Sequence, residues 1–204
     1  VLMLAAISNS HENKRDPMTA FDTNIQGLHN VLDACIQTNV KRIIFASSVW
    51  MYSLTDDFKV NEDTPLDINK SNHLYITTKA AGEMLIKTYH KQYGLDYTIM
   101  RYGIAYGQQS NIETALAAFT NRAINNKTIR INGDGEQFRN FMHVSDHARA
   151  NLAVLQNENA INQTINFDGP SQVTLNNIIN FLRERHPDLH VEYVDPINGD
   201  YRGR

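Results

Sequence analysis

The chain has 204 residues and a formal net charge of −3, with 42% hydrophobic and 20% charged residues. These values are typical of a soluble globular protein, and the lack of a basic run argues against nucleic acid as a partner. No apolar stretch is long enough to span a bilayer, and the apolar first residues lack the basic flank of a signal peptide. Cys35 is the single cysteine, so neither a disulfide nor a thiolate metal site is expected, and the expected location is the cytoplasm.

Short apolar runs alternate with longer amphipathic segments along the chain, which is the pattern of βαβ units. We predict strands at 1–5, 41–46, 96–101 and 163–167, and a short one near 191–194. The predicted helices lie at 19–38, 75–93, 112–126, 145–157 and 174–186. This order indicates an open parallel sheet with helices on both faces. From about residue 108 the alternation loosens, which indicates a smaller second lobe of helices and short strands.

Local signals place several boundaries of these elements. Thr19 is the predicted N-cap of the first helix, which should end near Asn39. Gly94 is a suitable left-handed C-cap for the helix at 75–93. The segment Gly133-Asp134-Gly135 lies between two extended runs and predicts a turn.

A tyrosine and a lysine four residues apart open the second predicted helix, in Tyr75-Ile76-Thr77-Thr78-Lys79. Residues at this spacing share one helix face, and a nearby cation favours the phenolate and lowers the tyrosine pKa. Ser47-Ser48 ends a predicted strand, and parallel sheets bind ligands beyond the carboxyl ends of their strands. Such a pair occurs on many surface helices by chance, but its convergence with the strand ends predicts proton transfer at a carbinol or carbonyl carbon.

Several segments, spread over nearly the whole chain, carry a resemblance to a known family. They are Leu4-Ala5-Ala6, Asn24-Ile25-Gln26-Gly27, Ser47 to Tyr52, Tyr75 to Lys79, Arg101-Tyr102-Gly103 with Tyr106-Gly107, and Gly133 to Asp146. With these segments the chain resembles the extended short-chain dehydrogenases/reductases of the NAD-dependent epimerase/dehydratase family, which act on nucleotide sugars.

The resemblance implies roles for individual residues. Ser48, Tyr75 and Lys79 would be catalytic: Tyr75 would move the hydroxyl proton, Lys79 would hold the nicotinamide ribose and lower the tyrosine pKa, and Ser48 would hold the reacting oxygen. Ser48 and Arg139 would bind the substrate, Arg139 through a nucleotide phosphate. The cofactor would be NAD, with NADP as the alternative, and its implied contacts are Leu4, Ala5, Ala6, Asn24, Ala46, Ser47, Tyr75, Lys79 and Tyr102.

The chain also departs from the family pattern. The dinucleotide loop G-x-x-G-x-x-G is absent, and the chain begins at what would be the fourth strand of the family fold. We therefore expect a partial Rossmann-like, doubly wound parallel α/β sheet lacking its first strands, with a small C-terminal substrate-binding lobe. Residues 1–107, with the strand at 163–167, would form the C-terminal part of the NAD-binding domain, and 108–204 mainly the substrate lobe. Such a piece of a longer enzyme should bind NAD weakly or not at all.

Three functions remain open at this stage. The first is a nucleotide-sugar epimerase, the second a reductase or dehydrogenase of the same family, and the third a non-catalytic binding module. A 4,6-dehydratase is not expected, because Val49-Trp50 replaces the Asp-Glu pair used for water elimination. No metal site is predicted, since His143 and His147 lack a third ligand. The resemblance implies a homodimer through the helices at 19–38 and 75–93.

Overall fold

The computed structural model describes residues 1–111, 114–196 and 203, without the side chains of residues 10–12. The chain forms two compact units. The first contains residues 1–103 and 148–167, and the second contains the described residues of 104–147 and 168–204. Whether these units divide the cofactor and substrate roles as the sequence predicts stays a prediction.

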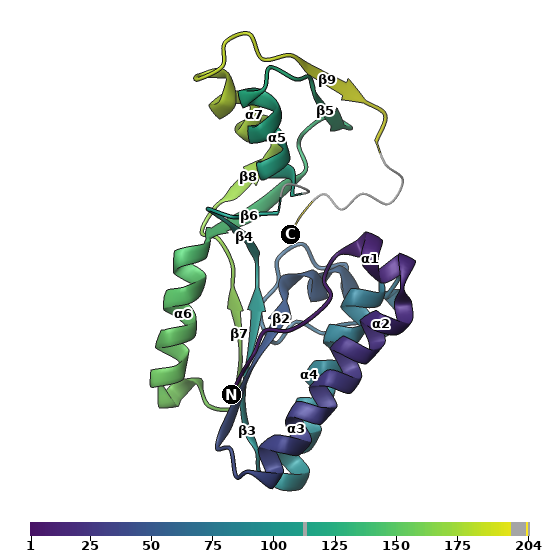
Figure 1. The fold of residues 1–204 in the computed structure, drawn as a ribbon, viewed down its shortest axis with the longest axis vertical. Coiled ribbons are helices and arrows are strands. Elements are labelled where there is room, and N and C mark those ends of the chain that lie inside the picture. The colour runs from purple at the N-terminus through teal and green to yellow at the C-terminus, as the bar shows by residue number, and fades with distance from the viewer. Residues whose placement is uncertain (112–113, 197–202, 204) are drawn as a thin grey trace. The chain divides into compact units, whose positions relative to one another are not determined.

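The first unit is built on a four-stranded parallel sheet in the order β1-β2-β3-β7 (Figure 1). Its strands are β1 (Leu2–Met3), β2 (Arg42–Ser48), β3 (Asp96–Tyr102) and β7 (Gln163–Phe167). The predicted parallel sheet is therefore confirmed, although β1 is shorter than the predicted strand at 1–5. Ser48 is paired with Tyr102, and Tyr102 with Phe167, so β2, β3 and β7 end together at one edge.

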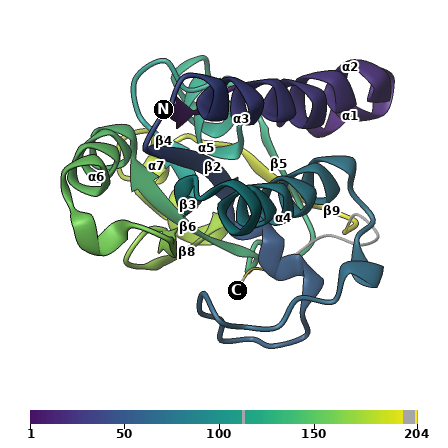
Figure 2. The same cartoon turned by 90° about the horizontal axis from the view of Figure 1, so that it is seen from below.

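Helices cover both faces of this sheet, as expected for a doubly wound fold (Figures 1 and 2). Successive residues of β2 point to opposite faces. Ile43 and Phe45 pack in a core with α3 (Gly27–Gln37) and α4 (Leu74–Tyr93). Ile44 packs in a second core with Ala150 and Val154 of α6 (Val144–Gln156). Cys35 of α3 is buried in the first core as a free thiol.

The segment predicted as one helix at 19–38 is divided. It comprises α2 (Pro17–Phe21), a π-helix η1 (Asp22–Gln26) and α3, and α1 (Ser10–Arg15) precedes them. Thr19 is not the N-cap as predicted. Asp16 takes that place: its carboxylate accepts the Thr19 backbone N–H at 3.0 Å, and Pro17 occupies the first helical position.

Helix α4 begins and ends close to the predicted bounds. His73 caps its first turn, with its Nδ1 accepting the Tyr75 backbone N–H at 3.2 Å. Gly94 ends the helix in the left-handed conformation at φ 71°, which confirms the predicted C-cap.

Three short 3₁₀ helices connect the larger elements of the first unit, namely η2 (Val49–Leu54), η3 (Ile68–Lys70) and η4 (Glu158–Ala160). No helix among the described residues is long and apolar enough to cross a membrane.

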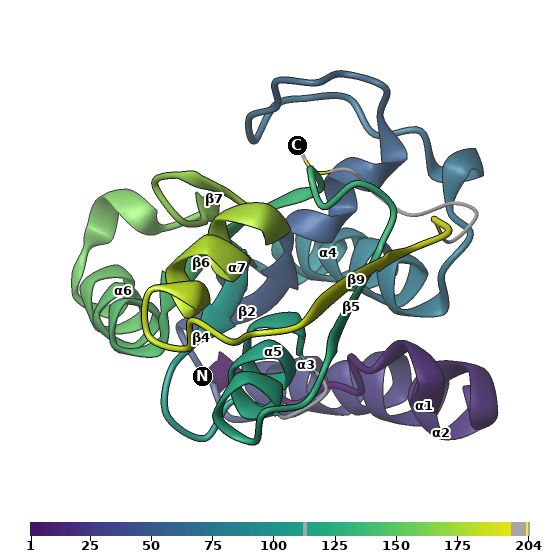
Figure 3. The same cartoon turned by 90° about the horizontal axis from the view of Figure 1, so that it is seen from above.

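The second unit contains two small sheets and two helices (Figure 3). Strands β4 (Ile104–Tyr106), β6 (Phe138–His143) and β8 (Gln172–Thr174) form one sheet, and β5 (Ile129–Asn132) pairs with β9 (Val191–Val194). Helices α5 (Ala115–Ile124) and α7 (Leu175–Arg183) share a core with β5. The first two residues of the helix predicted at 112–126 lie outside the described residues. Gly133 and Gly135 have φ values of 77° and 76° in the predicted turn.

Candidate active site

The carboxyl end of β2 and the first two turns of α4 bring the predicted catalytic residues together. Ser48 is the last residue of β2, and Tyr75 and Lys79 lie one turn apart on α4. The Ser48 side chain forms a hydrogen bond with the Tyr75 hydroxyl. The Lys79 ammonium lies 5.7 Å from the centre of the Tyr75 ring. The predicted convergence of these three residues is therefore present within the first unit.

Lys79 is buried, with only 4% of its surface exposed. Its ammonium donates a hydrogen bond of 2.6 Å to the Ala46 carbonyl and lies 4.8 Å from the centre of the Phe45 ring. Burial lowers the pKa of Lys79 from 10.5 to about 8, and the Glu83 carboxylate partly opposes this shift. The side chain is thus held in place by the strand that ends at Ser48.

The pKa of Tyr75 differs from the sequence-based expectation. Burial raises it above 10, and the hydrogen bond from Ser48 only partly opposes that increase. The expected lowering by Lys79 is wrong for this structure, because the ammonium points to the Ala46 carbonyl and lies over the face of the tyrosine ring.

Ser48 also shapes the backbone that follows it. Its Oγ accepts the Trp50 backbone N–H at 3.2 Å and caps the 3₁₀ helix η2. This contact fixes the serine hydroxyl at the junction between strand and helix. The same hydroxyl then faces Tyr75, so one side chain orders the turn and contacts the candidate acid–base group.

The residues predicted to contact the cofactor have different surroundings. Leu4 and Ala5 are exposed after β1, and Ala6 is half-buried. Asn24 is buried and engaged within the chain: its Oδ1 accepts from the Ile7 N–H at 2.8 Å, and its Nδ2 donates to the Ile7 carbonyl and to Thr78. Tyr102 is half-buried, and its hydroxyl donates to Asn151. Their cofactor roles stay predictions.

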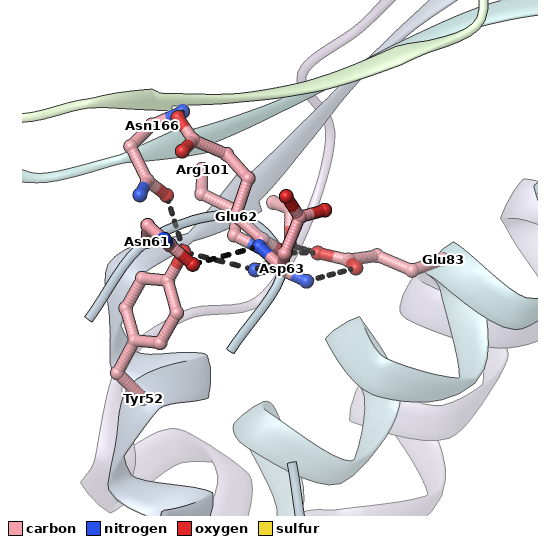
Figure 4. Close-up of polar contacts among 8 residues, drawn as sticks. Tyr52, Asn61, Glu62, Asp63, Glu83, Arg101 and Asn166 are labelled. Atoms are coloured by element: carbon pink, nitrogen blue, oxygen red, sulfur yellow. Dashed lines mark hydrogen bonds and ion pairs between the residues drawn. The ribbon is translucent and has the colours of Figure 1, made fainter. Parts of the chain in front are cut away.

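A buried polar group beside these residues was missed by the sequence reasoning (Figure 4). Glu83 of α4 and Arg101 of β3 are each 4% exposed and form an ion pair of 2.9 Å. Ser47 donates to the Glu83 carboxylate at 2.5 Å. The sequence does hold a signal for Glu83, because it follows Lys79 by four residues and therefore shares its helix face.

Arg139, the predicted phosphate ligand, lies on β6 in the second unit. It is half-buried, and its Nη1 donates to the Phe138 carbonyl at 2.7 Å. Its role toward a nucleotide stays a prediction. Among the described residues, no group of three histidine, cysteine or acidic side chains is arranged to hold a metal ion.

The family model "NAD dependent epimerase/dehydratase family" matches residues 1–167 of the chain. The chain belongs to this family. UDP-glucuronate 4-epimerase of Thermodesulfobacterium geofontis is 32% identical over 188 residues, which cover 89% of this chain and 55% of that protein. The chain thus spans little more than half the length of that family member.

Solved structures of family members have the same fold. UDP-N-acetylglucosamine 4-epimerase of Methanobrevibacter ruminantium M1, in complex with UDP-N-acetylmuramic acid, is 27% identical with a TM-score of 0.90 over 100% of this chain and 66% of that one. UDP-glucuronic acid 4-epimerase of Bacillus cereus, in complex with UDP-glucuronic acid and NAD, is 25% identical with a TM-score of 0.86 over 98% of this chain and 63% of that one. The expected Rossmann-like architecture is confirmed by this likeness.

Proposed function

We propose that this chain carries the proton-transfer residues of an NAD-dependent nucleotide-sugar epimerase. The observation that supports it most directly is the meeting of Ser48, Tyr75 and Lys79 at the carboxyl edge of a parallel sheet. The likeness to epimerases that bind UDP-sugars supports the substrate class.

In the proposed reaction the protein removes a proton from a sugar hydroxyl and later returns one. Tyr75 is the group for this transfer: its phenolate would take the proton of the sugar hydroxyl and, as the neutral hydroxyl, return it, and the hydrogen bond that Ser48 donates favours the phenolate. The Lys79 ammonium lies 5.7 Å from the centre of the tyrosine ring. Bound NAD would accept a hydride from the sugar carbon and return it.

The residues at this edge fit the nicotinamide-ribose half of the cofactor. An ammonium has three N–H donors, and Lys79 gives one of them to Ala46, which leaves donors suited to ribose hydroxyls. Ala5 and Ala6 follow β1 with small side chains and are exposed and half-buried, so they leave room for a flat ring at this end of the strand. NADP stays the alternative cofactor.

A reductase or dehydrogenase of the same family is the second candidate, because the same three residues serve a net transfer of hydride. The absence of an Asp-Glu pair at Val49-Trp50 argues against a 4,6-dehydratase. A non-catalytic binding module is less well supported, since such a module has no physical need for a lysine buried beside a tyrosine.

We also propose that the protein is a homodimer through α3 and α4. Met84 and Tyr93 of α4 are 62% and 58% exposed, although they belong to a helix whose other face covers the sheet. Val31 of α3 is only partly buried. A second copy of this helix pair would remove these apolar side chains from water.

The assay for the main proposal uses the natural protein that carries this chain, supplied with NAD and either UDP-glucose or UDP-glucuronic acid. We expect the 4-epimer to form, detected by NMR of the sugar, without net production of NADH. Stoichiometric NADH would instead support the dehydrogenase. If neither UDP-sugar binds or reacts, the nucleotide-sugar assignment is wrong.

A further inference from the structure

Helix α4 presents three polar side chains to the end of β2, each one turn from the next. Tyr75 contacts Ser48, Lys79 donates to the Ala46 carbonyl, and Glu83 accepts from the Ser47 hydroxyl. Three consecutive strand residues are therefore each held by the same helix. Glu83 is the only one of the three helix residues without a role in the proposed proton transfer.

The Glu83 carboxylate is fully engaged by groups from two strands. Its Oε1 accepts from Ser47 Oγ at 2.5 Å and from Arg101 Nε at 3.0 Å, and its Oε2 accepts from Arg101 Nη2 at 2.9 Å. Both ions are 4% exposed. A two-point contact between a guanidinium and a carboxylate fixes orientation as well as distance.

Arg101 is in turn held by groups at the same sheet edge (Figure 4). Its Nη1 donates to the Tyr52 hydroxyl at 2.9 Å, and Tyr52 donates to the Asn166 side chain of β7 at 2.6 Å. The Asn166 backbone N–H donates to the Glu62 carboxylate at 2.7 Å. Glu83 therefore links α4 directly to the ends of β2 and β3, and to β7 through Arg101 and Tyr52.

We propose that Glu83 is a positioning residue, which fixes the end of β2 against α4 and so sets where Ser48 and Lys79 lie relative to Tyr75. The inference rests on the proposed function, because it assigns Glu83 a task in that same site. It predicts that loss of the carboxylate both changes the surroundings of Lys79 and lowers kcat in the folded protein, whereas an ion pair that only stabilises the fold would leave kcat unchanged.

The groups that face Lys79 make this consequence measurable. They are Tyr75 and Glu83 from its own helix and the Phe45 ring and Ala46 carbonyl from β2, with Arg101 behind Glu83. Among them Glu83 is the carboxylate that raises the pKa of Lys79 against the effect of burial. Removing its charge should therefore lower that pKa further.

The experiment follows the ¹³Cε signal of Lys79 by NMR during a pH titration of lysine-labelled protein, with Lys79→Met to assign the signal. We expect a pKa of about 8 in the unaltered protein and a lower value in Glu83→Gln. The matched control is Tyr52→Phe, which removes the contacts at the far side of Arg101 and leaves those of Ser47 with Glu83. We expect this control to lower the free energy of unfolding and to leave the pKa of Lys79 unchanged.

An unchanged Lys79 titration in Glu83→Gln would overturn the proposal, as would an equal shift in Tyr52→Phe. If Glu83→Gln does not fold because Arg101 is left unpaired, the double variant Glu83→Gln/Arg101→Gln removes both ions of the pair. The pKa of Lys79 should again be lower than in the unaltered protein, by a smaller amount because a neighbouring cation is removed as well. In the active protein Glu83→Gln should lower kcat roughly tenfold to hundredfold with little change in KM. The NMR measurement does not depend on turnover. If the pKa of Lys79 shifts in Glu83→Gln but the natural protein has no activity, the proposed function is refuted and the positioning role of Glu83 is not.

Discussion

Burial is the main cause of the pKa shifts of Tyr75 and Lys79, the two central residues of the site. Lys79 and Tyr75 both lose water, which disfavours the ammonium and the phenolate alike. The spacing of the two residues in the sequence predicts that they share a helix face, and they do. It does not predict the direction in which the ammonium points, because the Ala46 carbonyl that holds it comes from a strand more than thirty residues away.

Replacement of Tyr75 by phenylalanine tests its proposed role directly. The variant loses the hydroxyl and keeps the ring, so we expect kcat to fall by about 10²-fold or more while NAD binding changes little. Turnover and cofactor titration of the natural protein measure the two effects. Tyr89→Phe, on the same helix, is the control and should keep full activity. An active Tyr75→Phe variant would refute the assignment.

The lowered pKa of Lys79 predicts a dependence of stability on pH. Below about pH 8 the lysine is charged in both states, and burying the charge costs on the order of 3 kcal/mol. As the pH rises from about 8 toward 10.5, the folded state loses its proton first, so this cost disappears and stability increases.

Urea unfolding of the unaltered chain and of Lys79→Met at pH 7.5 to 9.5 measures this dependence. We expect the free energy of unfolding of the unaltered chain to rise with pH relative to that of Lys79→Met. The exposed Lys87 lies on the same helix, and Lys87→Met, which keeps Lys79, should show the same rise with pH as the unaltered chain. A constant difference between the chain and Lys79→Met across this range would contradict the lowered pKa.

At the scale of elements, the close approach of α4 to β2 depends on a residue without a side chain. A Cβ added at Gly82 would lie 2.8 Å from the Phe45 ring and 3.1 Å from Leu28, and both neighbours are buried. Gly82 thus allows the helix that carries Tyr75, Lys79 and Glu83 to lie against the strand that carries Ser48.

The π-helix that divides the segment 17–37 contains Asn24, whose side-chain amide donates to the Ile7 carbonyl and to the Thr78 hydroxyl.

Two glycine-to-alanine substitutions should have opposite effects on stability. Gly82→Ala gains helix propensity but overpacks the core, so we expect a net loss of about 1 kcal/mol. At Gly27 the added Cβ meets only the Asp22 carbonyl at 3.5 Å, so Gly27→Ala should stabilise the chain by about 0.5 to 1 kcal/mol. Denaturant unfolding measures both. Stabilisation by Gly82→Ala would show that the helix can move away from the strand.

At the scale of the whole molecule, each unit has its own hydrophobic core. The first unit packs helices on both faces of its sheet, and the second packs α5 and α7 on β5. The candidate proton-transfer residues belong to the first unit, and Arg139 belongs to the second. The proposed homodimer concerns the first unit alone, because α3 and α4 lie within it.

The proposed dimer predicts a particle of twice the subunit mass when the natural protein that carries this chain is sedimented at micromolar concentration. Met84→Glu places a charge on the exposed face of α4 and should shift the protein to a monomer without unfolding it. Ile124→Glu is a matched control, since Ile124 is 63% exposed on α5 of the second unit, and it should stay dimeric. A monomeric mass for the unaltered protein would count against the interface.

The parallel sheet and its main helices are predictable from the amino-acid sequence, because hydrophobic period is a local property. The meeting of Ser48, Tyr75 and Lys79 is then expected, because residues that follow the carboxyl ends of parallel strands lie at one edge of the sheet. Short strands in the second lobe and two extended runs around Gly133-Asp134-Gly135 are also predicted, but the bounds of β4, β5, β6 and β8 are not, since these strands are too brief for a clear period. The other features of the site depend on contacts between segments that are distant in the sequence. Burial raised the pKa of Tyr75, and the Glu83–Arg101 pair formed because folding brings the ends of separate strands together on one helix.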